Sequence, residues 1–165
     1  MGSGVIIPYL YPDYSGYQND IQNYANLLNG IQYEAYNLNS NGMINYMGDG
    51  GVTSTLLNLN VPAYPMIVND YSISNVENLL DNQNVQQQFI QTAITYALNN
   101  GYSGYSIDFE PPGGADFSQT DAYNFILFLN NFANALHNNG LKLLVAIDPA
   151  YNGVPNSELF YYFYH

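Results

Sequence analysis

A helical pattern that ends at an Asn-Gly and then passes into a strand pattern occurs three times in this chain. Nothing else in the sequence constrains the fold as much. Apolar residues recur at helical spacing over 17–28, 85–98 and 121–137. Each of these stretches stops at Asn-Gly or Asn-Asn-Gly, and an apolar stretch with strand character follows. Glycine just past a helix relieves the left-handed conformation that ends it, so each of these glycines is predicted to mark a helix end.

Strands that alternate with helices of this length predict parallel βα units, and therefore an α/β fold. The expected strands are 5–11, 31–38 with an excursion to about Met47, 63–69, 104–110 and 141–148. The apolar runs 5–7, 63–68 and 143–147 indicate strands buried on both faces. Asn41-Gly42 is different, because extended segments flank it on both sides, and we expect a hairpin turn there.

No composition break divides the chain, so residues 5–165 are predicted to form one α/β domain. Residues 1–4 are interpreted as an initiation or cloning remnant.

The charge balance excludes several classes of function. Only 8% of the residues are charged, Lys142 is the only lysine or arginine, and the formal net charge is −12. Nucleic-acid binding, phosphate clamps and attachment to anionic membranes all need basic residues that this chain lacks. The absence of cysteine and the presence of only two histidines argue against a metal site, and we expect no metal or cofactor. The composition therefore leaves uncharged polar molecules as the expected ligands.

An acidic pair provides the strongest local signal. In residues 104–111, GYSIDFEP, side chains alternate between the two faces of a strand, so Ser106, Asp108 and Glu110 share one face. The prolines that follow put Glu110 at the carboxyl end of the strand. Two carboxylates about 6–7 Å apart along a strand repel each other, which is expected to raise the pKa of at least one. A carboxyl group that stays protonated near neutrality can act as a general acid. The alternative is a solvated strand end with two incidental acids.

Residues 103–110, SGYSIDFE, resemble the fourth-strand motif of family 18 glycoside hydrolases (chitinases and relatives), written DGxDxDxE. The similarity is strongest to the branch that acts on peptidoglycan-type glycans. An Asn-Gly-Tyr before the strand, a proline-rich loop after it, a Tyr-Asn-Phe helix and a Leu-Leu-Val-Ala-Ile strand follow the family order. The resemblance implies a partial TIM (β/α)8-type barrel with about five parallel strands and crossover helices. It also implies that the chain is the N-terminal part of a longer barrel.

By the same resemblance, the chain is expected to be a glycosidase that hydrolyses β-1,4-linked N-acetylglucosamine-containing glycans such as chitin or peptidoglycan. The mechanism would be retaining and substrate-assisted. Glu110 would protonate the glycosidic oxygen, while Asp108 would orient the 2-acetamido group that attacks the anomeric carbon. Ser103 stands where the family has its first Asp, and Ser106 stands where the family has Asp or Asn. The hydroxyl of Ser106 can still donate a hydrogen bond.

Five residues are expected to bind the glycan: Ser106, Tyr9, Tyr11, Asn69 and Asp148. The two tyrosines could stack on a sugar ring, or they could belong to the core. Asn69 could hydrogen-bond a sugar, or it could begin a turn. Asp148 could line the cleft, or it could cap a loop.

Two other functions remain open. One is a non-catalytic glycan-binding or surface-structural protein on the same fold. The other is a glycosidase with its own carboxylate nucleophile, for which Asp148 is the candidate.

A complete barrel takes about 250 residues, so a missing C-terminal segment or a second copy is expected to close this one. The composition, rich in asparagine and tyrosine, favours secretion to an extracellular or cell-surface location.

Overall fold

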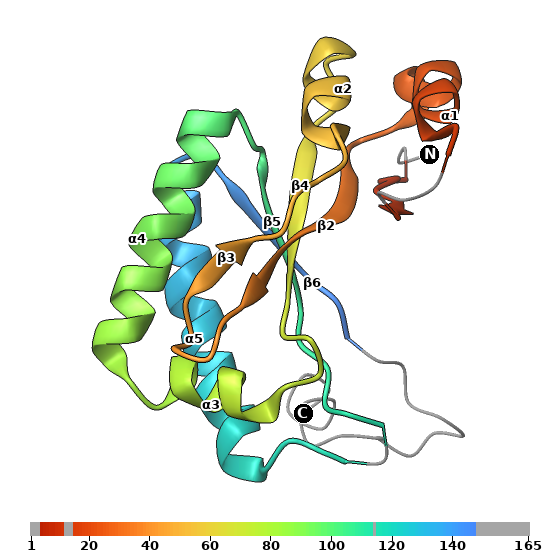
Figure 1. Ribbon diagram of the computed structural model, residues 1–165. Helices are drawn as coiled ribbons and strands as arrows, with labels where there is room; N and C mark the ends of the chain where they lie inside the picture. Colours follow the sequence, from red (N-terminus) through yellow and green to blue (C-terminus); the bar gives the residue numbers. More distant parts are fainter. Residues whose placement is uncertain (1–3, 12–14, 114, 148–165) are drawn as a thin grey trace.

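The computed structural model describes residues 4–11, 15–113 and 115–147. The strands are β1 (Tyr9–Leu10), β2 (Ile31–Leu38), β3 (Ile44–Tyr46), β4 (Ala63–Val68), β5 (Gly104–Asp108) and β6 (Lys142–Val145). The α-helices are α1 (Tyr17–Tyr24), α2 (Val52–Asn58), α3 (Ile73–Leu80), α4 (Gln83–Asn100) and α5 (Gln119–His137). A short 3-10 helix, η1 (Ala25–Leu27), follows α1 (Figure 1).

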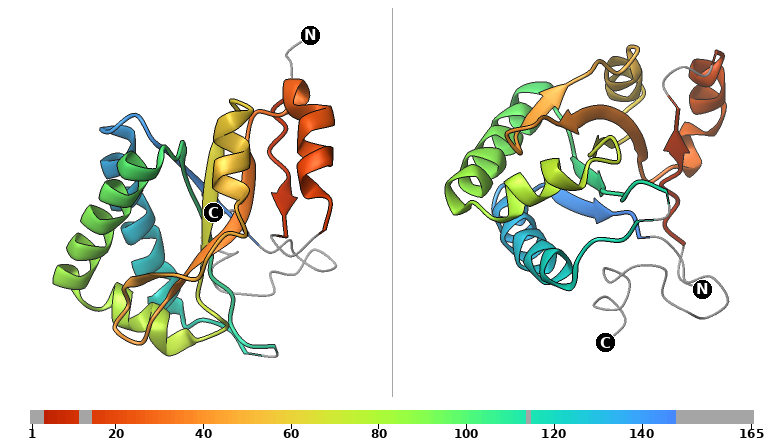
Figure 2. Two further views of the ribbon diagram at one scale, coloured as in Figure 1. Left: turned by 45° about the horizontal axis from the view of Figure 1, so that its top comes forward. Right: turned by 60° about the horizontal axis from the view of Figure 1, so that its bottom comes forward.

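These strands form one sheet in the order β1-β2-β4-β5-β6, and all of these neighbours are parallel. The added strand β3 pairs with β2 in the antiparallel direction, which confirms the hairpin turn expected at Asn41-Gly42. Helices lie around the outside of the curved sheet (Figure 2). Within the described residues, β1 and β6 form the two ends of the sheet, which does not close. The fold is therefore α/β, and it is a partial barrel, as expected.

The first strand is shorter than predicted. Val5 is 74% exposed, so the expectation that 5–7 is buried on both faces is wrong. The backbone amide of Ile6 donates to Oδ1 of the Asn29 side chain, at 2.8 Å. Since β1 pairs only with β2, one of its edges lacks a neighbouring strand among the described residues. The last strand, β6, is likewise only half-buried. The prediction of burial on both faces holds for β4.

Aromatic packing on the helix-facing side of the sheet holds the layers together. Tyr105 and Ile107 of β5 point toward the helices and are fully buried. The Tyr105 hydroxyl donates to the backbone carbonyl of Ala93 in α4, at 2.7 Å. Phe89 of α4 meets Phe132 of α5 edge to face, with ring centroids 5.4 Å apart. The side chains on this side of β5 therefore belong to the core, and the side chains on its other side face the concave surface of the sheet.

Gly104 lets β5 and β6 approach closely. Its φ is +154°, and a Cβ atom at this position would lie 1.9 Å from the backbone oxygen of Lys142. Any other residue would collide with the neighbouring strand. Because β5 also carries Asp108, this glycine helps to position the pocket described next.

Candidate active site

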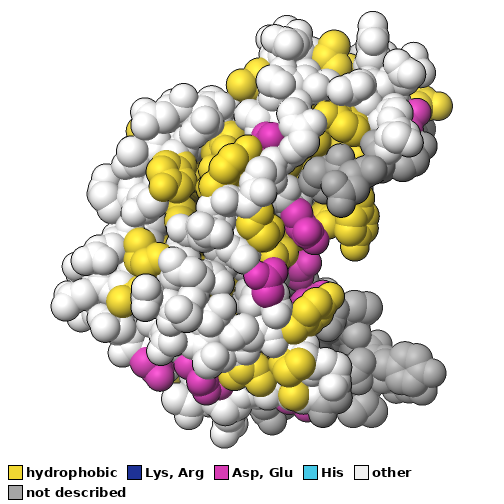
Figure 3. Space-filling model, in the orientation of Figure 1, with side chains coloured by type: hydrophobic (Ala, Val, Ile, Leu, Met, Phe, Trp, Pro, Cys, Tyr) yellow, Lys and Arg dark blue, Asp and Glu magenta, His cyan; other side chains and the backbone are white. Residues whose placement is uncertain are grey.

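A pocket of about 380 Å³ lies where the carboxyl ends of the central strands meet. Its lining residues are Tyr9, Tyr11, Gln32, Glu34, Met66, Val68, Asn69, Asp70, Tyr71, Asp108, Glu110 and Ala146. Figure 3 shows acidic side chains gathered in a hollow on this face of the molecule. In parallel α/β folds, this end of the strands is where ligands bind.

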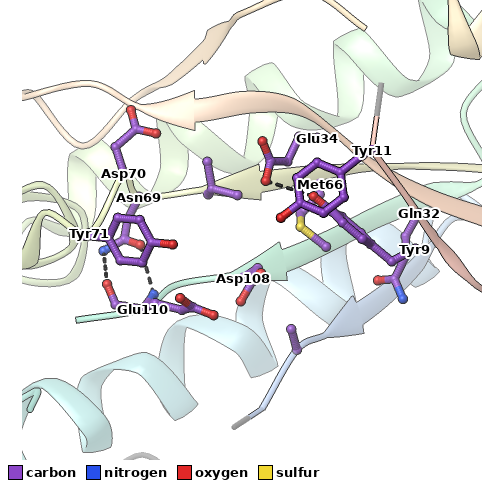
Figure 4. A pocket seen from close by; sticks show the side chains of 12 residues that line it. Tyr9, Tyr11, Gln32, Glu34, Met66, Asn69, Asp70, Tyr71, Asp108 and Glu110 are labelled. Atoms are coloured by element: carbon purple, nitrogen blue, oxygen red, sulfur yellow. Dashed lines mark hydrogen bonds between the residues drawn. The ribbon is translucent and has the colours of Figure 1, made fainter. Parts of the chain in front are cut away.

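Asp108 and Glu110 both line the pocket, and both are half-buried. Asp108 is the last residue of β5 and pairs in register with Val68 of β4. Phe109, between them, points the other way and packs against Phe125 of α5, with ring centroids 5.5 Å apart. The alternation predicted from the sequence is therefore what brings the two carboxyl groups to the concave face (Figure 4).

Asn69 holds the backbone of Glu110. Its Oδ1 accepts from the Glu110 amide at 2.9 Å, and its Nδ2 donates to the Glu110 carbonyl at 2.8 Å. A third bond runs from Nδ2 to the carbonyl of Ser72, at 3.2 Å. The side chain is only 1% exposed. These bonds engage both hydrogens of the amide group, so the structure shows Asn69 as a support for Glu110. A direct contact between Asn69 and a sugar stays a prediction.

Ser106 lies beneath the pocket and does not line it. Its side chain is fully buried, and its hydroxyl donates to Oε1 of Gln32 at 2.9 Å. Gln32 in turn lines the pocket. The expected hydrogen-bond donor at position 106 is therefore present, but its partner is an amide of β2. Contact between Ser106 and a glycan stays a prediction.

Two tyrosines of the first strand region form one wall. The hydroxyl of Tyr9 donates to Oε1 of Glu34 at 2.8 Å, and the ring of Tyr9 meets that of Tyr11 edge to face at 4.9 Å. Burial, followed by the hydrogen bond to Glu34, raises the pKa of the Tyr9 phenol far above its ordinary value. Tyr9 therefore stays protonated and keeps its donor directed at Glu34. Tyr11 is well exposed and presents an aromatic surface to the pocket.

The opposite wall contains a strained turn. Asp70 and Tyr71 follow Asn69 and have φ values of +49° and +58°. The left-handed conformation costs a non-glycine residue about 1–2 kcal/mol. The Asp70 carboxylate accepts a hydrogen bond from Nδ2 of Asn37, which helps to hold this conformation. Tyr71 and Glu110 both line the pocket (Figure 4). Backbone strain of this kind tends to occur at functional sites.

Four further residues line the pocket and were not predicted from the sequence: Glu34, Gln32, Asp70 and Tyr71. A signal for the first two was present: Gln32 and Glu34 alternate with buried apolar residues in a predicted strand, as Ser106 and Asp108 do. Asp148, the remaining expected site residue, lies outside the described residues. Within the part of the chain that the structure describes, no three histidine or acidic side chains are grouped so that they could hold a metal ion.

Fold and pocket together define a class. A curved parallel sheet with outer helices and an acidic, tyrosine-lined pocket at the carboxyl ends of its strands has the architecture of part of a (β/α)8 barrel, whose sites lie at this end.

Comparisons with known proteins support this architecture. No family model matches the sequence, and no curated protein matches it either. Among solved structures, a chitinase from Chromobacterium violaceum is similar with a TM-score of 0.71 and 24% identity over 93% of this chain and 50% of that chain. A class V chitinase from Pseudomonas fluorescens has a TM-score of 0.78 and 18% identity, and covers 95% of this chain and 49% of that chain.

The spore cortex-lytic enzyme SleL from Bacillus megaterium has a TM-score of 0.76 and 17% identity over 89% of this chain and 35% of that chain. The chain thus spans half or less of the length of each of these proteins. At these identities the likeness shows the fold: the described strands and helices have the fold of part of a family 18 chitinase barrel.

Proposed function

We propose that this chain hydrolyses β-1,4-linked N-acetylglucosamine-containing glycans, such as chitin or peptidoglycan. The observation that carries the proposal is the position of Asp108 and Glu110 in one tyrosine-lined pocket at the carboxyl end of β5. The titles of the similar structures, chitinases and a spore cortex-lytic enzyme, favour the same substrate class.

In the proposed reaction, Glu110 is the general acid. It donates its proton to the glycosidic oxygen as the bond to the anomeric carbon breaks. The carbonyl oxygen of the sugar's own 2-acetamido group attacks the anomeric carbon, so the protein supplies no nucleophile. The carboxylate that Glu110 has then become accepts a proton from the water that completes hydrolysis. Asn69 supports this role because it fixes the backbone that carries the carboxyl group.

Asp108 is proposed to orient the acetamido group and to stabilise the positive charge that develops on it. The neighbouring carboxylates Glu34 and Asp70 line the same pocket and strengthen its negative potential. The only lysine of the chain, Lys142, is the first residue of β6 and therefore lies at the amino end of that strand, whereas the pocket lies at the carboxyl ends of the strands. This environment favours a cationic transition state.

The decisive experiment compares the protein with its Glu110→Gln variant on a chromogenic N-acetyl-chitooligosaccharide. Loss of the acid is expected to reduce kcat at least about a hundredfold, the usual contribution of a general acid, with little change in KM. Asp20→Asn, the same carboxyl-to-amide change on the exposed side of α1, is the control and should retain activity. Turnover that survives Glu110→Gln would refute the proposed mechanism.

A second function is favoured by one observation. Ser106 occupies a buried position of β5 where the resembled family has Asp or Asn, and its hydroxyl is hydrogen-bonded to Gln32. A protein without the family's side chain at this position could bind glycans without cleaving them. Binding of the oligosaccharide with no turnover, unaffected by Glu110→Gln, would support this non-catalytic glycan-binding or surface-structural role.

We also propose that a further segment or a second copy completes the barrel. Among the described strands, β1 and β6 each have a neighbour on one side only, and unpaired strand edges tend to recruit further strands. Light scattering checks the second copy: a dimer has twice the chain mass of 18.4 kDa.

The proposed location is extracellular or at the cell surface. Among the described residues, no helix is both long and apolar enough to cross a membrane.

A further inference from the structure

A second pocket of about 280 Å³ lies on the other side of the sheet from Asp108. Four tyrosines line it together with three polar residues: Tyr36, Tyr46, Tyr96, Tyr102, Asp49, Thr53 and Asn100. Tyr36 packs against Tyr105, which belongs to the helix-facing side of β5, so this tyrosine pocket does not share a wall with the acidic cleft. Figure 3 shows hydrophobic side chains on the surface between α4 and α2, apart from the acidic hollow.

The aromatic rings of this tyrosine pocket are held in place before any ligand arrives. Tyr36 is buried and stacks on Tyr96, with ring centroids 6.0 Å apart and planes 19° apart. The hydroxyls of Tyr36 and Tyr102 share a buried hydrogen bond of 2.8 Å. On this rigid base, Tyr46 is 54% exposed and Tyr96 is 38% exposed. Rigid, partly exposed tyrosines give contact area at little cost in conformational entropy.

Besides the phenol hydroxyls, the polar side chains of the pocket are Asp49, Thr53 and Asn100, and each takes part in a hydrogen bond. The carboxylate of Asp49 accepts from the backbone amides of Gly51 at 3.0 Å and Thr53 at 3.1 Å. Burial acts to raise the pKa of Asp49, but the hydrogen bonds from Thr53 and Gly51 outweigh it, so the pKa lies below its ordinary value. Asn100 donates its Nδ2 to the carbonyl of Tyr96 at 2.8 Å, which fixes its orientation.

This chemistry selects a ligand class. A pyranose ring has an apolar face of C–H groups, which packs on an aromatic ring, and a rim of hydroxyls, which donate to a carboxylate and accept from phenols. Mostly apolar walls with a few placed polar groups are typical of small-molecule sites. The pocket contains one carboxylate and no cationic residue, so phosphate-bearing or uronic-acid ligands would be repelled.

We propose that the tyrosine pocket is a second sugar-binding site, which binds one uncharged pyranose unit of a glycan independently of the acidic cleft. This site goes beyond the proposed hydrolysis and does not require it. Its function would be to hold a glycan on the protein surface.

Titration of the Glu110→Gln protein with N-acetyl-chitotriose, and separately with cellotriose, tests the proposal by NMR. At least one probe is expected to shift the backbone amide signals of Gly51 and Thr53, which bond the pocket carboxylate. Tyr96→Ala should weaken the binding reported by these signals about tenfold, and Tyr96→Phe, which keeps the ring, should retain it.

Tyr123→Ala is the matched control, because this exposed tyrosine lies on α5 and is not part of the pocket. Two results would overturn the second site: Gly51 and Thr53 signals that neither probe moves, or shifts that persist unchanged in Tyr96→Ala. Shifts at Asp108 and Asn69 report the acidic cleft separately, so failure at one site is distinguishable from failure at the other.

Discussion

At the residue scale, a single amide group determines where the proposed general acid sits. Asn69 makes two hydrogen bonds to the backbone of Glu110 and one to Ser72 while it is almost fully buried. A buried backbone amide and carbonyl that lose their partner cost about 1–3 kcal/mol. The position of Glu110 therefore depends on a residue that follows a different strand.

Asn69→Ala is expected to lower the free energy of unfolding by about 1–3 kcal/mol and to reduce kcat about tenfold or more, with KM little changed. Urea unfolding and kinetics on the chromogenic oligosaccharide measure the two effects. Asn75→Ala is the control, because Asn75 also holds a backbone carbonyl, that of Leu38, but lies outside the pocket. Equal loss of kcat in both variants would contradict a positioning role for Asn69.

Residue by residue, the sequence predicted the acidic pair because a strand has a two-residue period and β5 keeps it without interruption. The same rule would have predicted Gln32 and Glu34. It would not have predicted Asp70 and Tyr71, since their position depends on two successive left-handed residues after β4. Nor could it show that Asn69 bonds Glu110, because that contact joins residues 41 positions apart.

At the scale of elements, the contact between β5 and β6 depends on Gly104. A side chain there would meet the backbone of Lys142, which cannot move without breaking the pairing of Gly104 with Lys142 and Tyr105 with Leu143. The strand that carries Asp108 would then lose its neighbour on one side.

Gly104→Ala is expected to lower the free energy of unfolding by about 3 kcal/mol, at the upper end of the usual cost of overpacking. Gly140→Ala is the comparison, since Gly140 also has a positive φ but open space around its Cβ, and should cost only about 1 kcal/mol. Thermal or urea unfolding monitored by circular dichroism measures both. Similar values for the two variants would show that the strand contact is not tight.

The two longest helices were predictable, while two of the short helices were not. α4 and α5 have 18 and 19 residues and side-chain caps at Asn82 and Ser118. α2 and α3 have only seven and eight residues, and no helix was predicted from the sequence over either of them. β1 was overestimated because an apolar run indicates burial only where neighbours cover both faces.

At the scale of the whole molecule, buried tyrosines make stability depend on alkaline pH. Burial raises the pKa of Tyr33, Tyr36 and Tyr105 far above the ordinary value. In the unfolded chain these phenols ionise near pH 10, whereas in the folded protein they remain protonated. Their contribution to stability is complete below that pH and is lost as the pH rises above it, because ionisation then favours the unfolded state.

The free energy of unfolding is therefore expected to be level up to about pH 9 and to fall above about pH 10. Each such tyrosine contributes up to about 1.4 kcal/mol per pH unit. Urea unfolding across this range measures the slope. Tyr105→Phe should make the slope shallower, whereas Tyr123→Phe, at an exposed position, should not. Stability that stays constant through pH 11 or so would contradict the expectation.

The tyrosine pocket has an optical consequence. The chain contains 18 tyrosines and no tryptophan, so its intrinsic fluorescence comes from phenol rings alone. Tyr36 and Tyr96 are close enough to exchange excitation, and Tyr46 lies against Tyr36 with ring centroids 5.2 Å apart. A molecule seated on these rings would alter their emission directly, so occupancy can be followed in the unlabelled protein by light alone.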